Sequence, residues 1–234
     1  TMKKLMWGLV GAALVASVVA ASAQEVLSAN TIGYIKKSLP PGGKVICLTV
    51  PLFSMTEGSN VFGRTSFAQE APNGSWVYFW NEGSQVWNGG TKSTKGVWAA
   101  LQSNYVIKAG EGFFLKSPTN SVTATEITIA GEVPALSTQT RSVMGGFSLG
   151  TVGNPYPADF KFGDSTLARN AANGSWVYFW NESSQVWNGG TKSTKGVWAA
   201  LQSNYVVKAT EGFFLKTSNA TSWVWTNAKP YTWP

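Results

Sequence analysis

The decapeptide NGSWVYFWNE occurs twice, at residues 73–82 and again at residues 173–182. The identity extends over residues 73–116 and 173–216, which agree at 41 of 44 positions. Fainter matches upstream, such as Phe62-Gly63 with Phe162-Gly163, widen each copy to about 100 residues. A repeat of this length indicates two copies of one small fold rather than a solenoid of short repeats. The three differences are Gly83/Ser183, Ile107/Val207 and Gly110/Thr210.

Each copy carries the local signals of β-strands. Residues 75–80, SWVYFW, are aromatic and β-branched, which favours a pleated strand. Residues 81–84 predict a turn and residues 85–87 a returning strand, and Asn88-Gly89 is typical of a type I′ hairpin turn. Residues 105–108 and 112–116 predict a further hairpin, and residues 97–102 fit a short helical turn.

These signals predict an all-β protein. Turn signals recur about every 8–12 residues, and no long segment has a helical period. We therefore expect two homologous antiparallel β-sandwich or barrel units in tandem, the first at residues 24–130 and the second at residues 131–234. The near-identity of the two C-terminal parts indicates a recent duplication or sequence conversion.

Residues 1–23 have the pattern of a secretory signal peptide. A basic start precedes an apolar run, and Ala21 and Ala23 fit an A-x-A cleavage site before Gln24. The apolar run is shorter than the roughly 18–20 residues of a membrane span, and an uncleaved N-terminal anchor is the alternative. We expect an exported chain without a membrane span after cleavage.

Charge and cysteine content narrow the range of partners. The chain has 18 basic and 11 acidic residues, a net charge of +7. The basic residues are scattered, with no run longer than Lys36-Lys37, which argues against a nucleic-acid surface. Cys47 is the one cysteine and excludes an internal disulfide framework. We expect it to be a packed thiol, with intermolecular pairing as the alternative.

Several catalytic and cofactor classes are absent. The chain has no histidine, which removes Ser-His-Asp and Cys-His arrangements and histidine-based zinc sites. It has no P-loop, and no G-x-G-x-x-G segment follows a strand and opens a helix. Asp159 and Asp164 are the candidate oxygen ligands for Ca²⁺, but calcium loops gather more acidic residues. We predict no cofactor and no metal.

A carboxylate pair, as in glycoside hydrolysis, is the remaining catalytic route. The candidates are Glu82 with Glu111 and, in the second copy, Glu182 with Glu211. All four lie in predicted turns, where a solvated or turn-capping carboxylate is usual. We therefore expect no enzymatic activity and no catalytic residues.

The repeated strand has two apolar faces. Alternation places Trp76, Tyr78 and Trp80 on one face, and Val77 and Phe79 on the other. The first face is either core, including core between the two units, or an aromatic platform; three open rings would form a large apolar patch. The candidate ligand-binding residues of such a platform are Trp76, Tyr78, Trp80, Trp87 and Asn88, with Trp176, Tyr178, Trp180, Trp187 and Asn188 in the second copy.

Further motifs accompany the tryptophan strand: KAGEGFFLK at residues 108–116, ITIAGEVP at 127–134 and VGNPYP at 152–157. In this combination the chain resembles uncharacterised exported β-rich tandem-repeat proteins of environmental bacteria. The resemblance implies an extracytoplasmic β fold, secreted or on the surface of a bacterium, and brings no catalytic residues. The first unit departs from the pattern, with TVPL at 49–52 where the second has GNPY at 153–156.

Two main functions fit these observations. The first is a non-enzymatic structural or cell-surface protein that assembles with itself into a filament, matrix or surface layer. Its contact would be sheet-edge pairing through the segment from Val26 to Ile35, unless that segment pairs within its own unit. The second is a carbohydrate-binding module for polysaccharide, with one tryptophan-lined site per unit. A carboxylate-pair glycoside hydrolase is the third.

Two smaller expectations concern lysines and the C-terminus. Lys92 and Lys95, in the polar loop of residues 89–96, are expected to be solvated or to form basic tips beside a sugar site. Trp223, Trp225 and Trp233 have no sequence counterparts in the first unit. We expect this tail to close the second unit's sheet or to cover the seam between the units. Equivalent aromatic residues should have similar burial.

Overall fold

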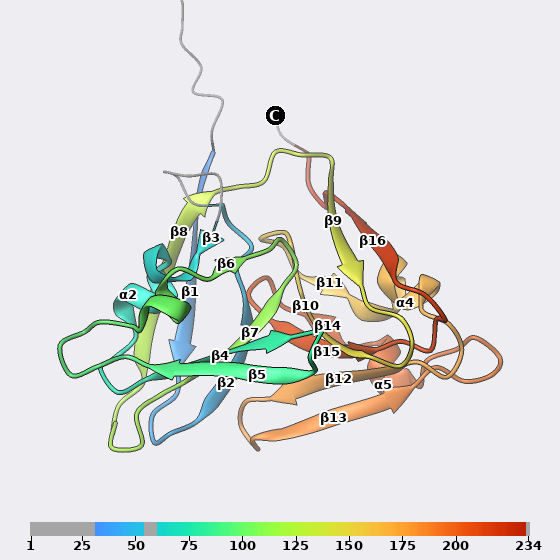
Figure 1. The fold of residues 1–234 in the computed structure, drawn as a ribbon. Coiled ribbons are helices and arrows are strands. Elements are labelled where there is room, and N and C mark those ends of the chain that lie inside the picture. The colour runs from blue at the N-terminus through green and yellow to red at the C-terminus, as the bar shows by residue number, and fades with distance from the viewer. Residues whose placement is uncertain (1–30, 54–59, 233–234) are drawn as a thin grey trace, which may run out of the picture.

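The computed structural model describes residues 31–53 and 60–232, which form two similar groups of strands in tandem (Figure 1). The predicted signal peptide lies outside the described residues. The first group comprises β1 (Ile32–Leu39), β2 (Val45–Thr49), β3 (Asn60–Val61), η1 (Phe62–Arg64), α2 (Ser66–Glu70), β4 (Trp76–Asn81), β5 (Val86–Thr91), α3 (Ala100–Ser103), β6 (Val106–Ile107), β7 (Gly112–Lys116) and β8 (Thr125–Glu132). The second comprises β9 (Thr138–Val143), β10 (Leu149–Gly153), β11 (Phe160–Lys161), η2 (Phe162–Asp164), α4 (Thr166–Asn170), β12 (Trp176–Asn181), β13 (Val186–Thr191), α5 (Ala200–Ser203), β14 (Val206–Val207), β15 (Gly212–Lys216) and β16 (Trp223–Ala228).

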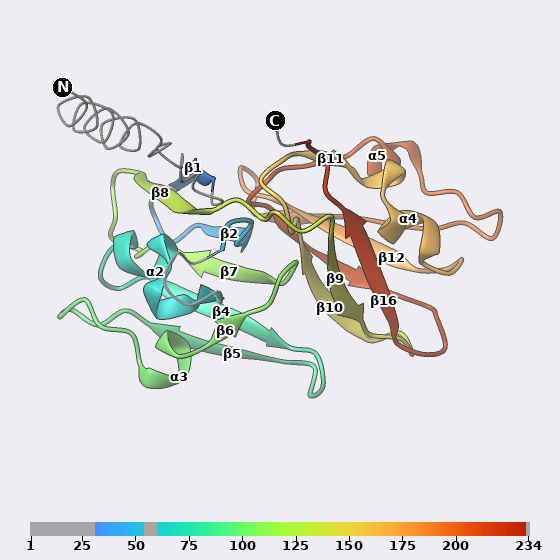
Figure 2. The same cartoon turned by 90° about the horizontal axis from the view of Figure 1, so that it is seen from above.

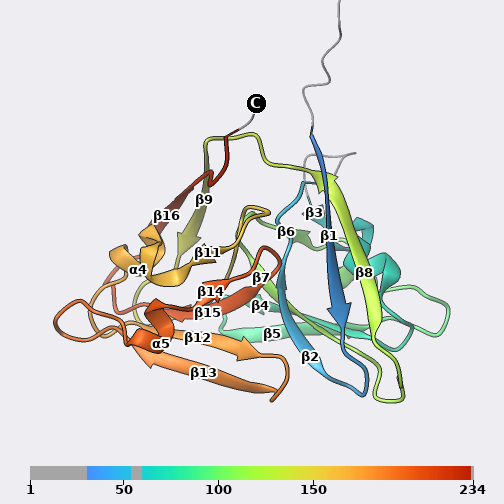
Figure 3. The same cartoon turned by 180° about the vertical axis from the view of Figure 1, so that it is seen from behind.

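All strand pairs between these elements are antiparallel, which confirms the all-β prediction. Each unit has a four-stranded sheet, with the order β2-β7-β4-β5 in the first and β10-β15-β12-β13 in the second. A two-stranded ribbon, β1–β8 or β9–β16, stands beside each sheet (Figure 3). Because β8 ends at Glu132 and β9 begins at Thr138, residues 133–137 connect the units, and the expected boundary after residue 130 falls within β8.

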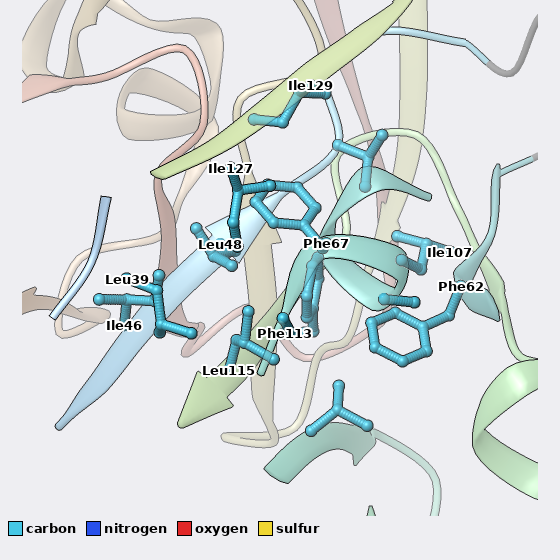
Figure 4. Packing of buried hydrophobic residues seen from close by; sticks show 14 of the residues in the cluster. Leu39, Ile46, Leu48, Phe62, Phe67, Ile107, Phe113, Leu115, Ile127 and Ile129 are labelled. Atoms are coloured by element: carbon cyan, nitrogen blue, oxygen red, sulfur yellow. The ribbon is translucent and has the colours of Figure 1, made fainter. Parts of the chain in front are cut away.

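The core of the first unit lies between the inner face of its sheet and the ribbon, with α2 closing one side (Figure 4). Alternation along β4 sends Val77 and Phe79 to this inner face, as predicted, and both are fully buried. They meet Phe67 of α2 and Ile127 of β8 in one cluster. The second unit repeats the arrangement with its own cluster (Figure 2). The opposite, outer face of each sheet does not contribute to this core.

The turn predicted at residues 81–84 is present, shifted by one residue, but two predicted hairpins are wrong. The β4–β5 turn lies at residues 82–85, and Asn88-Gly89 lies inside β5, where Phe79 pairs with Asn88 and Tyr78 with Gly89. Gly89 is needed because a Cβ there would lie 2.7 Å from Cδ1 of Tyr78, whose ring covers it. The adjacent Gly90 leaves room for Gln102 on the inner face. Close side-chain packing, rather than turn geometry, therefore explains the Asn-Gly-Gly sequence.

The expected hairpin across Ala109-Gly110-Glu111 is also absent from the described strands. Residues 106–107, which form β6, pair with β3, and β7 inserts between β2 and β4. The helical turn predicted at 97–102 is present, shifted, as α3. The apolar inner face of β7, with Phe113 and Leu115 fully buried, requires a central place in the sheet that a local hairpin would not give.

The C-terminal tail closes the second unit, as expected. Strand β16 pairs with β9, and Trp225 is buried in the second core. Trp225 lies opposite Arg141 in this ribbon, and Ile127 lies opposite Lys37 in the ribbon of the first unit. Ile127 is thus the structural counterpart of Trp225, two positions away from the residue that a spacing of 100 indicates. Trp233 lies outside the described residues.

Candidate functional site

The outer faces of the two sheets carry the predicted aromatic residues. Trp76 is 41% exposed, Trp87 is 39% exposed, and Tyr78 and Trp80 between them are half-buried. The copies match closely, since Trp176 is 41% and Trp187 37% exposed. Equivalent rings therefore have similar burial, as predicted. The face is neither a closed core nor a fully open platform, because the two units meet over part of it.

Rings from both units meet at the centre of the molecule. The Phe114 and Phe214 ring centroids are 6.1 Å apart. Phe114 contacts Trp180 and Trp187 of the second unit edge to face, at 6.0 and 5.6 Å. Phe214 contacts Trp80 and Trp87 of the first unit at 5.8 and 5.6 Å. Each contact occurs twice with the units exchanged, so the units are related by an approximate two-fold arrangement.

These rings line an open groove of about 740 Å³ between the units, which we call the central groove. Its lining is predominantly aromatic, the usual character of a ligand site. Cys47, a free cysteine, lies fully buried beneath the two phenylalanines. The groove is lined by Val45, Tyr78, Trp80, Gln85, Trp87, Phe114, Phe147, Leu149, Tyr178, Trp180, Trp187, Phe214 and Lys216.

The hairpin turns hold the two units together (Figures 1 and 3). Gln85 accepts from the backbone N–H of Leu149 at 2.9 Å and donates to its carbonyl oxygen at 3.0 Å. Gln185 makes the same pair of bonds with Val45, at 2.7 and 3.0 Å. Both glutamines have positive φ, 55° and 57°, which is uncommon outside glycine. The two side-chain amides thus bind the backbone at the start of a strand in the other unit, and these contacts fix the walls of the groove.

The indole N–H groups of Trp80 and Trp180 reinforce this contact. Trp80 donates to Leu149 O and Trp180 to Val45 O, each at 2.7 Å. Their rings are therefore fixed in position in the groove wall, while Trp87 and Trp187 pack against them edge to face at 5.0 and 4.9 Å. The predicted residues Tyr78, Trp80 and Trp87 are brought together with their copies in one composite site, rather than one site per unit.

The candidate carboxylate pairs lie outside the central groove, in two smaller cavities of about 260 and 250 Å³. Glu82 forms an ion pair with Arg141 of the second unit, and Glu182 with Lys37 of the first at 2.6 Å. Lys37 and Arg141 occupy equivalent places in the two ribbons. Burial raises the pKa of Glu82, against the opposing effect of Arg141. These carboxylates therefore bind the units to each other.

The second carboxylate of each pair is also held. Glu111 accepts hydrogen bonds from the Tyr105 hydroxyl and from the Lys108 backbone N–H at 2.9 Å. Glu211 accepts from Tyr205 and, at 3.1 Å, from Lys208 N. Burial raises the pKa of Glu211, and these hydrogen bonds oppose the shift. The candidate residues Asn88 and Asn188 line these cavities rather than the central groove.

Lys92 is neither solvated nor a basic tip, contrary to both expectations. Its side chain is buried, and Nζ donates to three carbonyl oxygens at the end of α2, those of Ala68, Gln69 and Ala71. Lys192 repeats these bonds in the second unit. The C-terminal carbonyls of a helix lack partners within the helix and attract a cation. Lys95 is exposed, as expected.

Asp159, one of the two candidate Ca²⁺ ligands, is held by groups of the protein itself. Asp159 accepts from Lys208 Nζ at 2.9 Å and from Ala209 N at 3.0 Å. Within residues 31–53 and 60–232, no cluster of acidic, cysteine or histidine side chains is suited to hold a metal ion. The helices found there are also too short or too polar to cross a membrane.

Comparison of the chain with family models, with curated proteins and with solved structures found no match. Its function is therefore argued from the geometry and chemistry of the central groove. Sequence reasoning missed four of the groove residues that matter most: Phe114, Phe214, Phe147 and Lys216. The Phe113-Phe114 doublet held a signal for the first two, because adjacent residues of a strand face opposite sides.

Proposed function

We propose that the protein is a non-enzymatic, exported polysaccharide-binding protein whose central groove holds one glycan chain across both units. The observation that carries this proposal is the composite groove, in which exposed Trp87 and Trp187 stand beside the rings of both sheets. The faces of pyranose rings present C–H groups to a partner, while their edges carry hydroxyls. Flat aromatic rings with a few polar groups suit both.

Polar groups for sugar hydroxyls are present at the same place. Within the described residues, the hydroxyls of Tyr78 and Tyr178 have no hydrogen-bond partner. Burial raises the pKa of both, so they remain protonated and can donate. The Gln85 amide is engaged by Leu149, which leaves the tyrosine hydroxyls and Lys216 as the polar groups that face a ligand.

Trp87→Ala together with Trp187→Ala tests the proposal. We expect the double variant to lose most retention of the protein on polysaccharide gels, because both exposed tryptophan rings of the groove are removed. Val97→Ala, at an exposed residue that does not line the groove, is a surface control that should bind as the wild type. The melting temperature from differential scanning calorimetry checks folding. A folded double variant with unchanged retention would contradict the proposal.

Self-assembly remains a second candidate, for one specific observation. In the described part of the segment from Val26 to Ile35, β1 pairs with β8 of its own unit, as in the alternative to sheet-edge assembly. The other edge of β1 pairs with no strand in the part of the chain that the structure describes. A strand with one open edge can accept another chain. Sedimentation at high protein concentration tests this function, and a strictly monomeric species would contradict it.

Export and the duplication of homologous units are part of the same proposal and rest on the sequence. For the carboxylate-pair hydrolase the arrangement offers no specific support, because each of the four glutamates is held by a neighbour. Glu82→Gln and Glu182→Gln test it. Polysaccharide hydrolysis that both changes abolish, in a protein that still binds, would favour the enzyme over the binding protein.

A further inference from the structure

We infer that the ligand of the central groove is an anionic polysaccharide, with carboxylate or sulfate groups on its sugar rings. This inference rests on the proposed function and adds the class of glycan. It starts from Lys116 and Lys216, which lie directly across the strands from Trp76 and Trp176. Each exposed indole thus has a lysine as its neighbour on the same face of the sheet.

The charges of these lysines are not matched by acidic neighbours. Lys37, Arg141 and Lys208 all form ion pairs with carboxylates. Within the described residues, Lys116 and Lys216 form none. Lys216 lines the central groove, and none of the described residues lining it carries a carboxylate. The glutamates nearest to the groove lie in the two smaller cavities and are already held. The groove therefore favours a ligand that brings negative charge.

Lys116 extends this surface at the other end. It lines a separate pocket with Trp76 and residues 117–120, beyond the end of the central groove. Trp76 stacks on Tyr78, with ring planes 12° apart, and Tyr78 lines the groove. The aromatic surface is thus continuous from this pocket into the groove. A linear polymer, rather than a single sugar, suits a path with a lysine at each end.

Phe147 gives independent evidence that the central groove is a ligand-binding site. It lines the groove beside Lys216, is 57% exposed, and has φ of 59°. Gly43 holds the equivalent place before β2, with φ of 75°. A bulky residue in this conformation is strained, and such residues gather at functional sites. An exposed ring on strained backbone contributes nothing to the core, so we assign Phe147 to contact with the ligand at the Lys216 end.

Binding of the full chain to de-esterified polygalacturonate and to its methyl ester tests the inference, because the two polymers differ in charge but share a backbone. Dextran sulfate compared with dextran separates sulfate from carboxylate recognition. Opposite charges a few ångströms apart near a protein surface attract each other, and the attraction is strongest when few ions screen it. We therefore expect about tenfold or stronger preference for the charged polymer in isothermal titration calorimetry at low salt, decreasing as salt is added.

Two variants and one control test which residues recognise the charged polymer. Lys216→Gln should lose most of the preference for the charged polymer, while Lys195→Gln, at an exposed lysine outside the groove, should keep it. Phe147→Gly should weaken binding severalfold without lowering the melting temperature. Equal losses in the two lysine variants would overturn the site assignment, and unchanged affinity in Phe147→Gly would overturn its role.

The polymers themselves separate failure of this inference from failure of the proposed function. Equal affinity for polygalacturonate and its methyl ester, and for dextran sulfate and dextran, would overturn the anionic class and leave glycan binding intact. No binding to any of the four polymers at millimolar sugar concentration would overturn both.

Discussion

Replacing Lys92 by methionine tests whether this lysine is a buried cap of α2 or a surface cation. Its Nζ donates to three carbonyl oxygens at 2.9, 2.8 and 2.8 Å, those of Ala68, Gln69 and Ala71. Burial also lowers the pKa of Lys92. Methionine has a similar volume but no donor. Ala68 O keeps its bond from Trp98 Nε1 at 2.9 Å, so two carbonyls lose their partner.

The free energy of unfolding should fall by about 2–4 kcal/mol. A buried acceptor without a partner costs about 1–3 kcal/mol, and the Gln69 carbonyl is only partly buried. For a chain of this size, each kcal/mol lowers the melting temperature by about 2–4 °C, which gives a shift of roughly 5–15 °C. Lys192→Met should have the same effect, because Nζ makes the equivalent bonds at 3.0, 2.8 and 2.7 Å.

Differential scanning calorimetry is the assay, with polysaccharide retention measured in parallel. Lys95→Met, in the same loop but exposed, is the control and should change stability by less than about 0.5 kcal/mol. The two units should contribute additively in the Lys92→Met, Lys192→Met double variant. A Lys92→Met protein that melts at the wild-type temperature but is no longer retained on polysaccharide would refute the reasoning. That result would show that Lys92 acts as a surface cation and not as a buried cap.

Three further predictions concern the seam and the groove. Gln185→Asn keeps an amide that tolerates positive φ, but the shorter side chain no longer reaches Val45. We therefore expect the free energy of unfolding, measured with denaturant, to fall by about 1–2 kcal/mol. An unchanged denaturation midpoint would contradict the role of the Gln185 hydrogen bonds in joining the units. Burial raises the pKa of Glu211 in the folded chain above its usual 4.5. Protonation of Glu211 therefore stabilises the fold fully below pH 4.5, and this contribution is lost as the pH rises through the pKa of the folded state. Acidification from pH 7 to 5 should therefore stabilise the wild type relative to Glu211→Gln, and parallel melting curves would argue against it. Phe147→Gly should raise or preserve the melting temperature, because about 1 kcal/mol of backbone strain is relieved; marked destabilisation would make the ring structural.

The fold was largely predictable because its signals are local. The 100-residue repeat, the alternation along residues 75–80 and the absence of helical periodicity sufficed for two tandem β units. The turn at residues 82–85 was predicted to within one residue, but the Asn88-Gly89 signal predicted a second turn that is not there. That pair proved to be a strand segment, because the Tyr78 ring and the Gln102 side chain need the space of two glycines. Local turn statistics do not contain such packing contacts.

The site was less predictable because it lies between two units. The tryptophans and tyrosines were identified, but their union in one groove depends on Gln85 and Gln185 reaching strands of the other unit. In the sequence, Gly42-Gly43 aligns most simply with Gly145-Gly146, and this alignment hides the equivalence of Gly43 and Phe147. The backbone instead places Gly42 with Gly146 and Gly43 with Phe147, two pairs that share positive φ. Lys92 was misjudged because the polar loop around it gave no sign of the helix end that it caps.

The stoichiometry of oligosaccharide binding tests the central claim, a single groove shared by both units, most directly. Isothermal titration calorimetry of the full chain with a defined oligogalacturonate, about six to eight sugars long, measures it at saturating protein concentration. The composite groove predicts one oligosaccharide per chain, with binding lost in either Trp87→Ala or Trp187→Ala alone. Two equivalent sites per chain, each abolished separately by its own tryptophan variant, would contradict the shared groove.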